Sequence, residues 1–400
     1  MKKIEKLLIA NRSEIAIRVM RAAAELNMAS VAIYSEEDRF ALHRFKAAEA
    51  YRIGKDCSPV QAYLQIDEIV QVAVQSGADA VHPGYGFLSE SPEFAKACIS
   101  AGLVFIGPSP EVMSRLGNKV QARTLAQENQ VPVMPASDAL PSDSSAVRAM
   151  ASAIGYPLML KASWGGGGRG MRVIESEAEL DAMVEIGRRE ADTAFGNDEV
   201  YLEKLVRRAR HVEVQVLGDQ QGTLVHLFER DCTVQRRNQK VVERAPAFFL
   251  TDAQRETICE SALRLCKGAG YHNAGTVEFL QDADTGEFFF IEVNPRIQVE
   301  HTVTEEITGI DIVKAQIRIA QGYSIGTEES GVPPQQQIMM RGHAMQCRIT
   351  TEDPENNFIP DYGEVDTYRS PSGFGIRLDA GTAYTGARVT RHYDSLLVKV

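Results

Sequence analysis

The sequence predicts an α/β protein with three parts: a doubly wound parallel sheet, a small α+β lid, and a larger mixed or antiparallel sheet domain. Three features lead to this prediction. Strand-like and helix-like segments alternate over residues 7–107, and four consecutive glycines lie between two strand-like segments at 158–174. Farther along, an apolar strand at 288–291 runs into regularly spaced polar residues that end at Glu300.

Composition narrows the function classes. The chain has 400 residues, of which 44% are hydrophobic and 24% charged, as expected for a globular protein of two or three domains. A net charge of −11 argues against general binding to nucleic acid or anionic membranes. Because no apolar run is long enough to span a membrane and the N-terminus lacks a secretory segment, we expect a cytoplasmic location. The six cysteines form no C-x-x-C pair and are expected to be reduced thiols.

The first part of the chain alternates strands and helices, which implies a parallel sheet with helical crossovers. Ser13 is available to cap the first helix. Ligands of such sheets bind at the carboxyl ends of the strands, where loops 11–13 and 82–87 fall. We expect strands at 7–10, 31–34, 80–81 and 104–107, and helices at 14–26, about 63–76 and 92–101.

Polar stretches at 135–145 and 324–337 divide the rest of the chain. The tail is expected to be antiparallel, with strands at 374–378 and 389–393. It ends in the apolar run 396–400, which we expect to be an unpaired edge strand and therefore a sign that the chain is a fragment. The expected units are an N-terminal domain at 1–118, a lid at 133–206, a catalytic unit at 207–340 and a truncated C-terminal domain at 341–400.

The glycine-rich segment matches the pattern G-x-G-x-x-G at Gly165, Gly167 and Gly170. A dinucleotide-binding fingerprint requires a helix directly afterwards, whereas residues 171–174 continue as a strand and the helix, 177–188, comes later. Walker A chemistry is also excluded, because no G-K-[ST] follows. The pattern favours a flap whose amides fold onto phosphates, with Lys161 placed to meet a phosphate oxygen. The alternative is a flexible surface loop.

The second strong signal is the polar series after the apolar strand. Because side chains alternate between the two faces of a strand, one face is expected to carry Glu292, Asn294, Arg296, Gln298 and Glu300, and the other Ile291, Val293, Ile297 and Val299.

A hairpin turn at 281–287 would bring Glu278 beside Glu292. Two adjacent carboxylates repel unless a cation lies between them or a proton is taken up, and oxygen ligands suit Mg²⁺. Arg296 would suit an oxyanion. The alternative is an amphipathic strand whose polar face contacts water.

A cation-rich stretch at 229–243 interleaves arginine and lysine with amides. This composition suits a phosphate or carbonate site. A solvated charged loop is the alternative.

Together these motifs resemble the ATP-grasp superfamily and, within it, the biotin carboxylases. The resemblance rests on residues 9–16, 82–90, the glycine flap, 229–243 and 296–305, and covers essentially the whole chain. At Trp164, Pro295 and Thr302 the sequence is most similar to the N-terminal biotin carboxylase domain of the pyruvate carboxylases. The family's domain continues beyond Val400, the chain has no Ala-Met-Lys-Met site for biotin attachment, and Asn238 stands where some relatives have histidine.

The resemblance assigns residues to roles. ATP would be held by Lys119, Lys161, Gly165, Gly166, Gly167, Gly168, Glu203, Lys204, His211, Gln235 and Leu280. Mg²⁺ or Mn²⁺ would be bound by Glu278, Glu292 and Asn294, and bicarbonate by Lys240, Arg296, Gln298 and the amide of Val299. Glu300 would be the general base, Arg348 would steady the charge that develops on biotin, and Tyr85 would line the biotin pocket.

The activity implied is ATP-dependent carboxylation of biotin by bicarbonate through carboxyphosphate. Biotin would arrive on a carrier domain, and a carboxyltransferase domain of the parent enzyme would complete the reaction. A homodimer or homo-oligomer is expected, with no nucleic-acid or membrane partner. The alternatives are the biotin carboxylase of an acetyl-CoA or other acyl-CoA carboxylase, another ATP-grasp ligase that forms an acyl or carbamoyl phosphate, a Rossmann oxidoreductase, and a non-catalytic assembly fragment. There are also alternatives for single residues: Lys119 could be a surface charge, Arg348 could form a structural salt bridge, and Glu243 could be an ion-pair partner.

Overall fold

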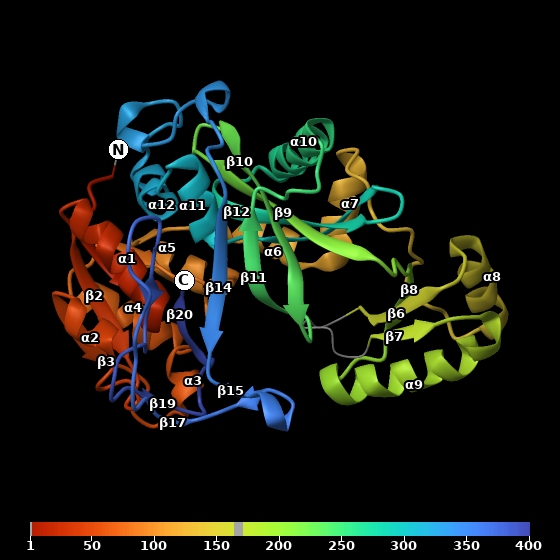
Figure 1. Cartoon of the computed structure of the whole chain (residues 1–400), viewed down its shortest axis with the longest axis horizontal. Coiled ribbons are helices and arrows are strands. Elements are labelled where there is room, and N and C mark those ends of the chain that lie inside the picture. Colours follow the sequence, from red (N-terminus) through yellow and green to blue (C-terminus); the bar gives the residue numbers. More distant parts are fainter. Residues whose placement is uncertain (1, 164–170) are drawn as a thin grey trace.

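The computed structural model describes residues 2–163 and 171–400, and its parts follow one another along the long axis (Figure 1). The parallel sheet lies at one end, a large antiparallel sheet in the middle, and a small three-stranded sheet at the other end. The flap residues Gly165, Gly166, Gly167 and Gly168, together with Trp164 and Arg169, lie outside the described residues. The predicted α/β class is confirmed.

The N-terminal sheet is parallel, in the order β3-β2-β1-β4-β5. The expected strands and helices are present, and loops 11–13 and 82–87 do follow the carboxyl ends of β1 and β4. β3, α2, α3 and α6, all of them short, were not predicted from the sequence. The elements are β1 Lys6–Ile9, α1 Ser13–Glu25, β2 Ala29–Tyr34, α2 Leu42–Lys46, β3 Glu49–Arg52, α3 Pro59–Ala62, α4 Ile66–Gln75, β4 Ala80–His82, α5 Pro92–Ser100, β5 Val104–Phe105 and α6 Pro110–Gly117.

Ser13 does not cap α1, contrary to expectation. Arg12 occupies the N-cap position and makes no side-chain cap. Ser13 has a φ of 55°, and its hydroxyl lies 3.4 Å from the hydroxyl of Thr382 in the C-terminal part of the chain. The start of α1 therefore contacts the C-terminal part of the chain.

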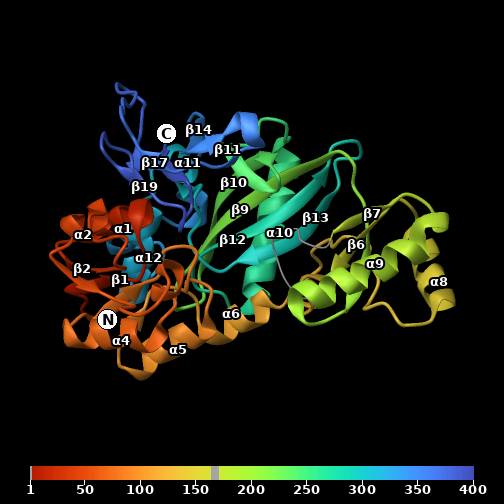
Figure 2. The ribbon, with the colours of Figure 1, turned by 90° about the horizontal axis from the view of Figure 1, so that it is seen from below.

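The small sheet has the antiparallel order β7-β6-β8. β7 follows the glycines directly, as expected, which excludes the strand–loop–helix geometry of a dinucleotide fingerprint. Figures 1 and 2 both place this unit, with its two helices, at the end of the molecule opposite the parallel sheet. Its elements are α8 Ser144–Ile154, β6 Leu158–Ala162, β7 Arg172–Ile174, α9 Glu177–Phe195 and β8 Val200–Lys204, and α7 Lys119–Glu128 precedes them.

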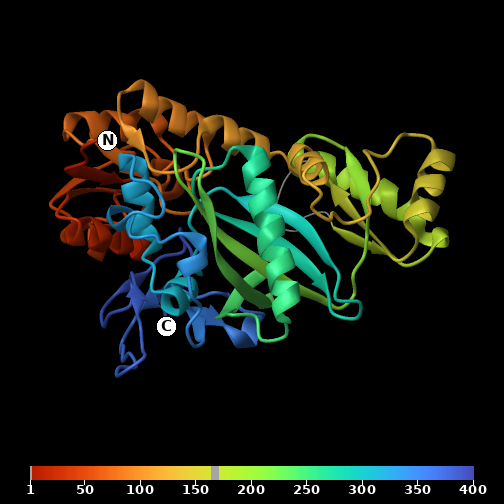
Figure 3. The same ribbon diagram turned by 90° about the horizontal axis from the view of Figure 1, so that it is seen from above.

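The central sheet has eight strands, in the order β13-β12-β9-β10-β11-β14-β20-β18. Helix α10 lies across one face (Figure 3) and packs its apolar side chains on β9, β12 and β13. The elements are β9 Ala209–Gly218, β10 Leu224–Arg236, β11 Gln239–Ala245, α10 Asp252–Ala269, β12 Asn273–Asp282, β13 Phe288–Asn294, α11 His301–Thr308, α12 Ile312–Gln321, β14 Ala344–Thr350, β18 Asp379–Ala380 and β20 Leu396–Lys399.

The tail differs from the prediction in two ways. Residues 374–378 form no strand, and Phe374 is fully exposed at 109%. Of the predicted strand 389–393, only the short β19 Arg388–Val389 is present, paired with β17 Gly363–Glu364. The apolar run 396–400 is not an unpaired edge, because β20 pairs with β14 on one side and β18 on the other. The remaining short pair is β15 Glu352–Asp353 with β16 Ile359–Pro360.

In residues 2–163 and 171–400, every helix is too short or too polar to cross a membrane.

Gly381 allows the C-terminal segment to approach the start of α1. A Cβ at this position would collide with the Ser13 hydroxyl and lie 2.5 Å from the Glu14 amide nitrogen. We expect Gly381→Ala to destabilise the protein by about 1–3 kcal/mol through overpacking. The melting temperature from differential scanning fluorimetry checks this.

Gly117→Ala is the matched control, because a Cβ there meets nothing within 4 Å. At this helical position alanine should be neutral or slightly stabilising. Equal melting temperatures for the two variants would contradict the close approach at Gly381.

Candidate active site

A cluster of buried charges surrounds Lys240, the second residue of β11. Its ammonium lies 2.8 Å from Glu278 on β12 and 2.7 Å from Glu300 at the start of α11, and it also contacts Glu213 on β9. The side chains of Glu213, Glu278 and Glu300 are between 0% and 7% exposed. Charges buried this deeply are tolerated only when they are paired and hydrogen-bonded, so one ammonium group holds three carboxylates in place.

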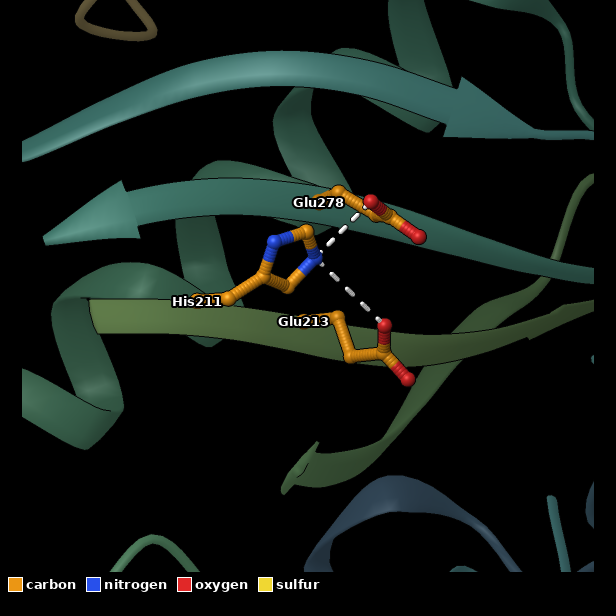
Figure 4. Close-up of side chains that lie close together, drawn as sticks. All are labelled: His211, Glu213 and Glu278. Carbon is orange, nitrogen blue, oxygen red and sulfur yellow. Dashed lines mark ion pairs between the residues drawn. The ribbon is translucent and has the colours of Figure 1, made fainter. Parts of the chain in front are cut away.

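The alternation of strand side chains explains why these groups meet. On β9, Val212, Val214 and Val216 face the core beneath α10, and the residues between them face the opposite side. Figure 4 shows His211 and Glu213 of β9 directed toward Glu278 of the neighbouring β12. The His211 Nε2 atom lies 2.8 Å from a Glu278 oxygen and 3.8 Å from a Glu213 oxygen.

Arg230, on β10, is completely buried beneath the cluster. Its Nε donates to Glu213 at 2.5 Å, and one terminal nitrogen donates to the side-chain amide oxygen of Gln298 at 2.9 Å. The remaining bonds go to Gln215, Thr276 and Thr304. Because every N–H of the guanidinium has an acceptor, Arg230 is a rigid support that fixes Glu213 and orients the amide of Gln298.

Arg348 of β14 extends the cluster on the other side of Glu300. It donates to Glu300 at 3.1 Å and to Glu243 of β11 at 2.6 Å. Glu243 also accepts from Gln346 at 2.9 Å. Arg348 therefore does form a structural ion pair with Glu243, and the same side chain reaches the candidate base.

The ionisation of the cluster follows from these pairs. Burial opposes the charge on Glu300, but Lys240, Arg348 and Arg230 together lower its pKa well below the usual range. Burial likewise opposes the charge on Glu278, whose pKa Lys240 and then His211 lower. Burial works against the ammonium of Lys240 too, and Glu213 and Glu300 raise its pKa. Glu278, Glu300 and Lys240 are therefore all charged at neutral pH.

Glu278 and Glu292 face each other across β12 and β13, as expected from the hairpin. Burial first, and then the charge of Glu278, raise the pKa of Glu292. The Asn294 amide donates to Glu278 at 2.9 Å, and its oxygen accepts from Arg296 at 3.2 Å. Two carboxylates and an amide oxygen are the donors that a hard divalent cation prefers, so these residues fit Mg²⁺ or Mn²⁺.

The expected continuation of this strand is wrong. β13 ends at Asn294, because Pro295 has no N–H to donate to a neighbouring strand. Residues 296–300, with a bend at Arg296 and a turn at Val299 and Glu300, form the turn segment that leads into α11. On the opposite face, Ile291 is 36% exposed and Val299 is only half-buried, so neither is a core residue as predicted.

The turn nevertheless delivers its polar side chains to the site. Gln298 donates to Glu278 at 2.8 Å, and Arg296 contacts Glu90 of the N-terminal unit as well as Asn294. The idea that this series faces water is excluded for Gln298 and Glu300, which are 3% and 2% exposed. The cation-rich stretch is likewise no solvated loop, because it forms β10 and β11.

The candidate ATP residues fall into two groups. On the lid, Lys161 of β6 contacts Glu203 of β8, and Lys204 donates to the carbonyl groups of Gly155 and Tyr156 at 2.8 and 2.9 Å. On the central sheet, Leu280 lies opposite His211, and Gln235 lies opposite Lys240.

Lys119, the first residue of α7, lies between these two groups. Burial first, and then the charge of Lys119, lower the pKa of Lys161 to about 8, and Glu292 opposes this shift. The same charge of Lys119 acts on Glu292 in the central sheet. Lys119 is therefore close enough to both groups to contribute to a site that the lid and the sheet share.

Three predicted residues lie outside the charged cluster. The Gln235 amide donates to the carbonyl group of Cys232, and Asn238 forms the turn between β10 and β11 with a φ of 63°. Tyr85 follows β4 in the N-terminal unit, where its hydroxyl contacts Glu14.

Several members of the site were not predicted from the sequence. Glu213 and Arg230 were not singled out, although β9 carries a clear signal in the alternation of His211, Glu213 and Gln215 with valines. Glu14 and Lys399 were not predicted either. They meet only in the folded chain, and no local pattern joins positions so far apart.

A strand–glycine loop–strand lid beside an antiparallel sheet with paired buried carboxylates defines an ATP-grasp enzyme. Three family profiles match the chain: "Biotin carboxylase, N-terminal domain" at residues 3–113, "Carbamoyl-phosphate synthase L chain, ATP binding domain" at 118–328, and "Biotin carboxylase C-terminal domain" at 346–400. The chain belongs to the biotin carboxylase family.

Individual relatives agree with this assignment. The chain is 53% identical to pyruvate carboxylase of Bacillus subtilis over 397 residues, covering 99% of this chain and 34% of that protein. A Rhizobium etli pyruvate carboxylase structure with acetyl coenzyme A matches with 64% identity and a TM-score of 0.92, over 99% of this chain and 35% of that one. The biotin carboxylase domain dimer of Hydrogenobacter thermophilus 2-oxoglutarate carboxylase, in complex with MgADP and bicarbonate, matches with 45% identity and a TM-score of 0.92, over 100% and 86% of the two chains. The chain thus spans about a third of the length of the pyruvate carboxylases.

The cluster predicts an unusual pH dependence for Lys240→Met. In the native protein the lowered pKa of Glu300 contributes stability above its unfolded value of about 4.5, and this stability is lost as pH falls. Without the ammonium, burial raises the pKa of the remaining carboxyl groups, so the variant should lose stability as pH rises through about 5–7. At neutral pH we expect a loss of about 3–5 kcal/mol.

Melting temperatures measured from pH 5 to 8 check this prediction. The control is Lys96→Met at an exposed position on α5, for which the difference from the unsubstituted protein should not depend on pH. If the melting-temperature difference between Lys240→Met and the unsubstituted protein is also independent of pH, Lys240 does not compensate the buried carboxylates.

Proposed function

We propose that this chain catalyses the ATP-dependent carboxylation of biotin by bicarbonate through carboxyphosphate, the first half-reaction of a pyruvate carboxylase. The observation that carries the proposal is the position of Glu300. It is a buried carboxylate held between Lys240 at 2.7 Å and Arg348 at 3.1 Å, and Lys240 also reaches the carboxylate Glu278 at 2.8 Å. The proposed base, Glu300, and a proposed metal ligand, Glu278, therefore both contact the anion-binding cation Lys240.

Lys240 and Arg296 would hold bicarbonate, with the Gln298 amide and the Val299 N–H. Both cations are paired with carboxylates in the structure, Lys240 with Glu300 and Arg296 with Glu90. A bound anion would share these cations and so weaken their hold on Glu300. The pKa of Glu300 would then rise toward the range in which it can accept the proton of bicarbonate.

The nucleotide would lie between the lid and the central sheet. Lys161 and Lys119 would contact its phosphates, together with the flap glycines Gly165–Gly168, and Glu203 and Lys204 would lie along the adenine. His211, Gln235 and Leu280 would complete the site from the sheet. Magnesium or manganese, when bound by Glu278, Glu292 and Asn294, would neutralise phosphoryl charge.

Bicarbonate held beside the terminal phosphate would attack it. The step would be fast because the two reactants are already positioned and do not have to meet by diffusion. Carboxyphosphate is prone to hydrolysis, so the lid unit would have to exclude water. Arg348 would stabilise the negative charge that develops on biotin, and Tyr85 would line the biotin pocket.

The assignment to pyruvate as final acceptor is supported by the 53% identity to pyruvate carboxylases of Bacillus subtilis and Staphylococcus aureus. We propose that a biotin carrier domain and a carboxyltransferase domain act with this chain, which would function as a homodimer or homo-oligomer in the cytoplasm. We also propose that residues 1–118, 133–206, 207–340 and 341–400 are the units of the chain, and that the second is a lid over the nucleotide.

Hydrolysis of ATP by the full chain tests the proposed function. It should require a divalent cation and bicarbonate, and its rate should rise with free biotin. Another ATP-grasp ligase would hydrolyse ATP without this dependence on bicarbonate and biotin, and a non-catalytic assembly fragment would not hydrolyse it at all. Either outcome would overturn the proposal.

Glu300→Gln tests the base. We expect bicarbonate-dependent ATP turnover to fall by roughly 10²–10⁴, the usual cost of losing a general base. ATP binding, measured by calorimetry, should persist. The matched control is Glu287→Gln, an exposed residue of the turn between β12 and β13, which should leave turnover unchanged. Unchanged turnover in Glu300→Gln would exclude Glu300 as the base.

A further inference from the structure

We propose that a buried ion pair, Glu14 with Lys399, positions both the biotin side and the bicarbonate side of the active site. Neither residue has a place in the reaction described above. The inference rests on the proposed function, because it takes Tyr85 as a biotin-pocket residue and Val299 as part of the bicarbonate site. Glu14 and Lys399 would be positioning residues, which act through these two neighbours.

Four distant segments of the chain meet at this pair. Glu14 is in the first turn of α1, and Lys399 is the last residue of β20. One Glu14 oxygen lies 3.0 Å from the Lys399 ammonium, and the other accepts from the Tyr85 hydroxyl. The same ammonium donates to the Val299 carbonyl oxygen at 2.9 Å. A continuous chain of contacts therefore runs from Tyr85 through Glu14 and Lys399 to Val299.

The pair is deeply buried, which makes its geometry rigid. The side chains of Glu14 and Lys399 are 4% and 1% exposed. Burial raises the pKa of Glu14, and Lys399 opposes that rise. A buried ion pair commonly contributes little net stability compared with apolar residues of similar volume. Its presence here is therefore better explained by what it holds in place than by the stability it adds.

Tyr85 is fixed from two directions. The side-chain amide of Asn11 donates to the carbonyl groups of Pro83 and Tyr85 at 2.7 and 2.8 Å, which holds the backbone of the loop. Glu14 then fixes the phenol ring through its hydroxyl. Asn11 and Glu14 lie three positions apart at the start of α1, so one short segment determines both the main chain and the side chain of Tyr85.

On the other side, Lys399 acts on the turn that carries the bicarbonate residues. Val299 lies between Gln298, which Arg230 orients, and Glu300, which Lys240 and Arg348 hold. With its carbonyl oxygen bound to Lys399, the turn is anchored at its main chain as well as through these two side chains. Loss of Lys399 would free the Val299–Glu300 peptide, which directly follows the Gln298–Val299 peptide whose N–H is proposed to face bicarbonate.

The experiment measures KM for free biotin, bicarbonate and ATP in the full chain and its variants. Glu14→Gln preserves size but removes the charge that orients Tyr85 and Lys399. We expect KM for biotin to rise about tenfold, the effect of one weakened hydrogen bond to a charged group. KM for ATP should change less than twofold. Lys399→Met should raise KM for both biotin and bicarbonate, and Glu25→Gln, at a partly exposed site on the same helix, is the matched control.

A double-mutant cycle separates positioning from a general loss of structure. In a Tyr85→Phe background, Glu14→Gln should change KM for biotin less than twofold, because its effect passes through the missing hydroxyl. Additive effects, an unchanged KM for biotin, or equal rises in KM for biotin and ATP would each overturn the inference. If the unsubstituted chain shows no biotin-dependent ATP hydrolysis, the proposed function itself fails, and this inference fails with it.

Discussion

The compensation of buried carboxylates by Lys240 is the constraint on which the rest of the site depends. Glu213, Glu278 and Glu300 come from β9, β12 and the start of α11, and each would be costly to bury alone. Lys240 contacts all three carboxylates. Arg230 supplies a second positive charge to Glu213, and Arg348 supplies one to Glu300. The result is a set of buried, paired side chains with fixed directions.

This arrangement links the parts of the chain. The central sheet runs without interruption from β13 to β18, so strands from the C-terminal segment, β14 and β20, are structurally continuous with those that carry Glu278 and Lys240. β14 contributes Arg348, β20 contributes Lys399, and the N-terminal unit reaches the same region through Glu14 and Glu90. The residues proposed to handle bicarbonate and biotin are therefore supported from three directions.

Much of this was predictable from the sequence, for identifiable reasons. The parallel sheet, the strand after the glycines and the pairing of Glu278 with Glu292 follow from local patterns, and all three are confirmed. The polar series 292–300 indicated the right residues, but the strand stops at Pro295 and the side chains converge through a turn. Glu213, Arg230, Glu14 and Lys399 were missed because a sequence does not reveal which polar strand face is buried, or which distant charges meet. The tail was misjudged because β20 finds partners on both sides.

We infer that Lys240 pairs with Glu213 and Glu300 and leaves Glu278 to share a divalent ion with Glu292. Anomalous scattering from a crystal grown with Mn²⁺ and ADP tests it most directly. We expect one manganese peak between Glu278 and Glu292, with the Lys240 ammonium still in contact with Glu213 and Glu300. A peak ligated by His211, Glu213 and Glu278, whose donor atoms also lie close enough together to hold an ion, would contradict it.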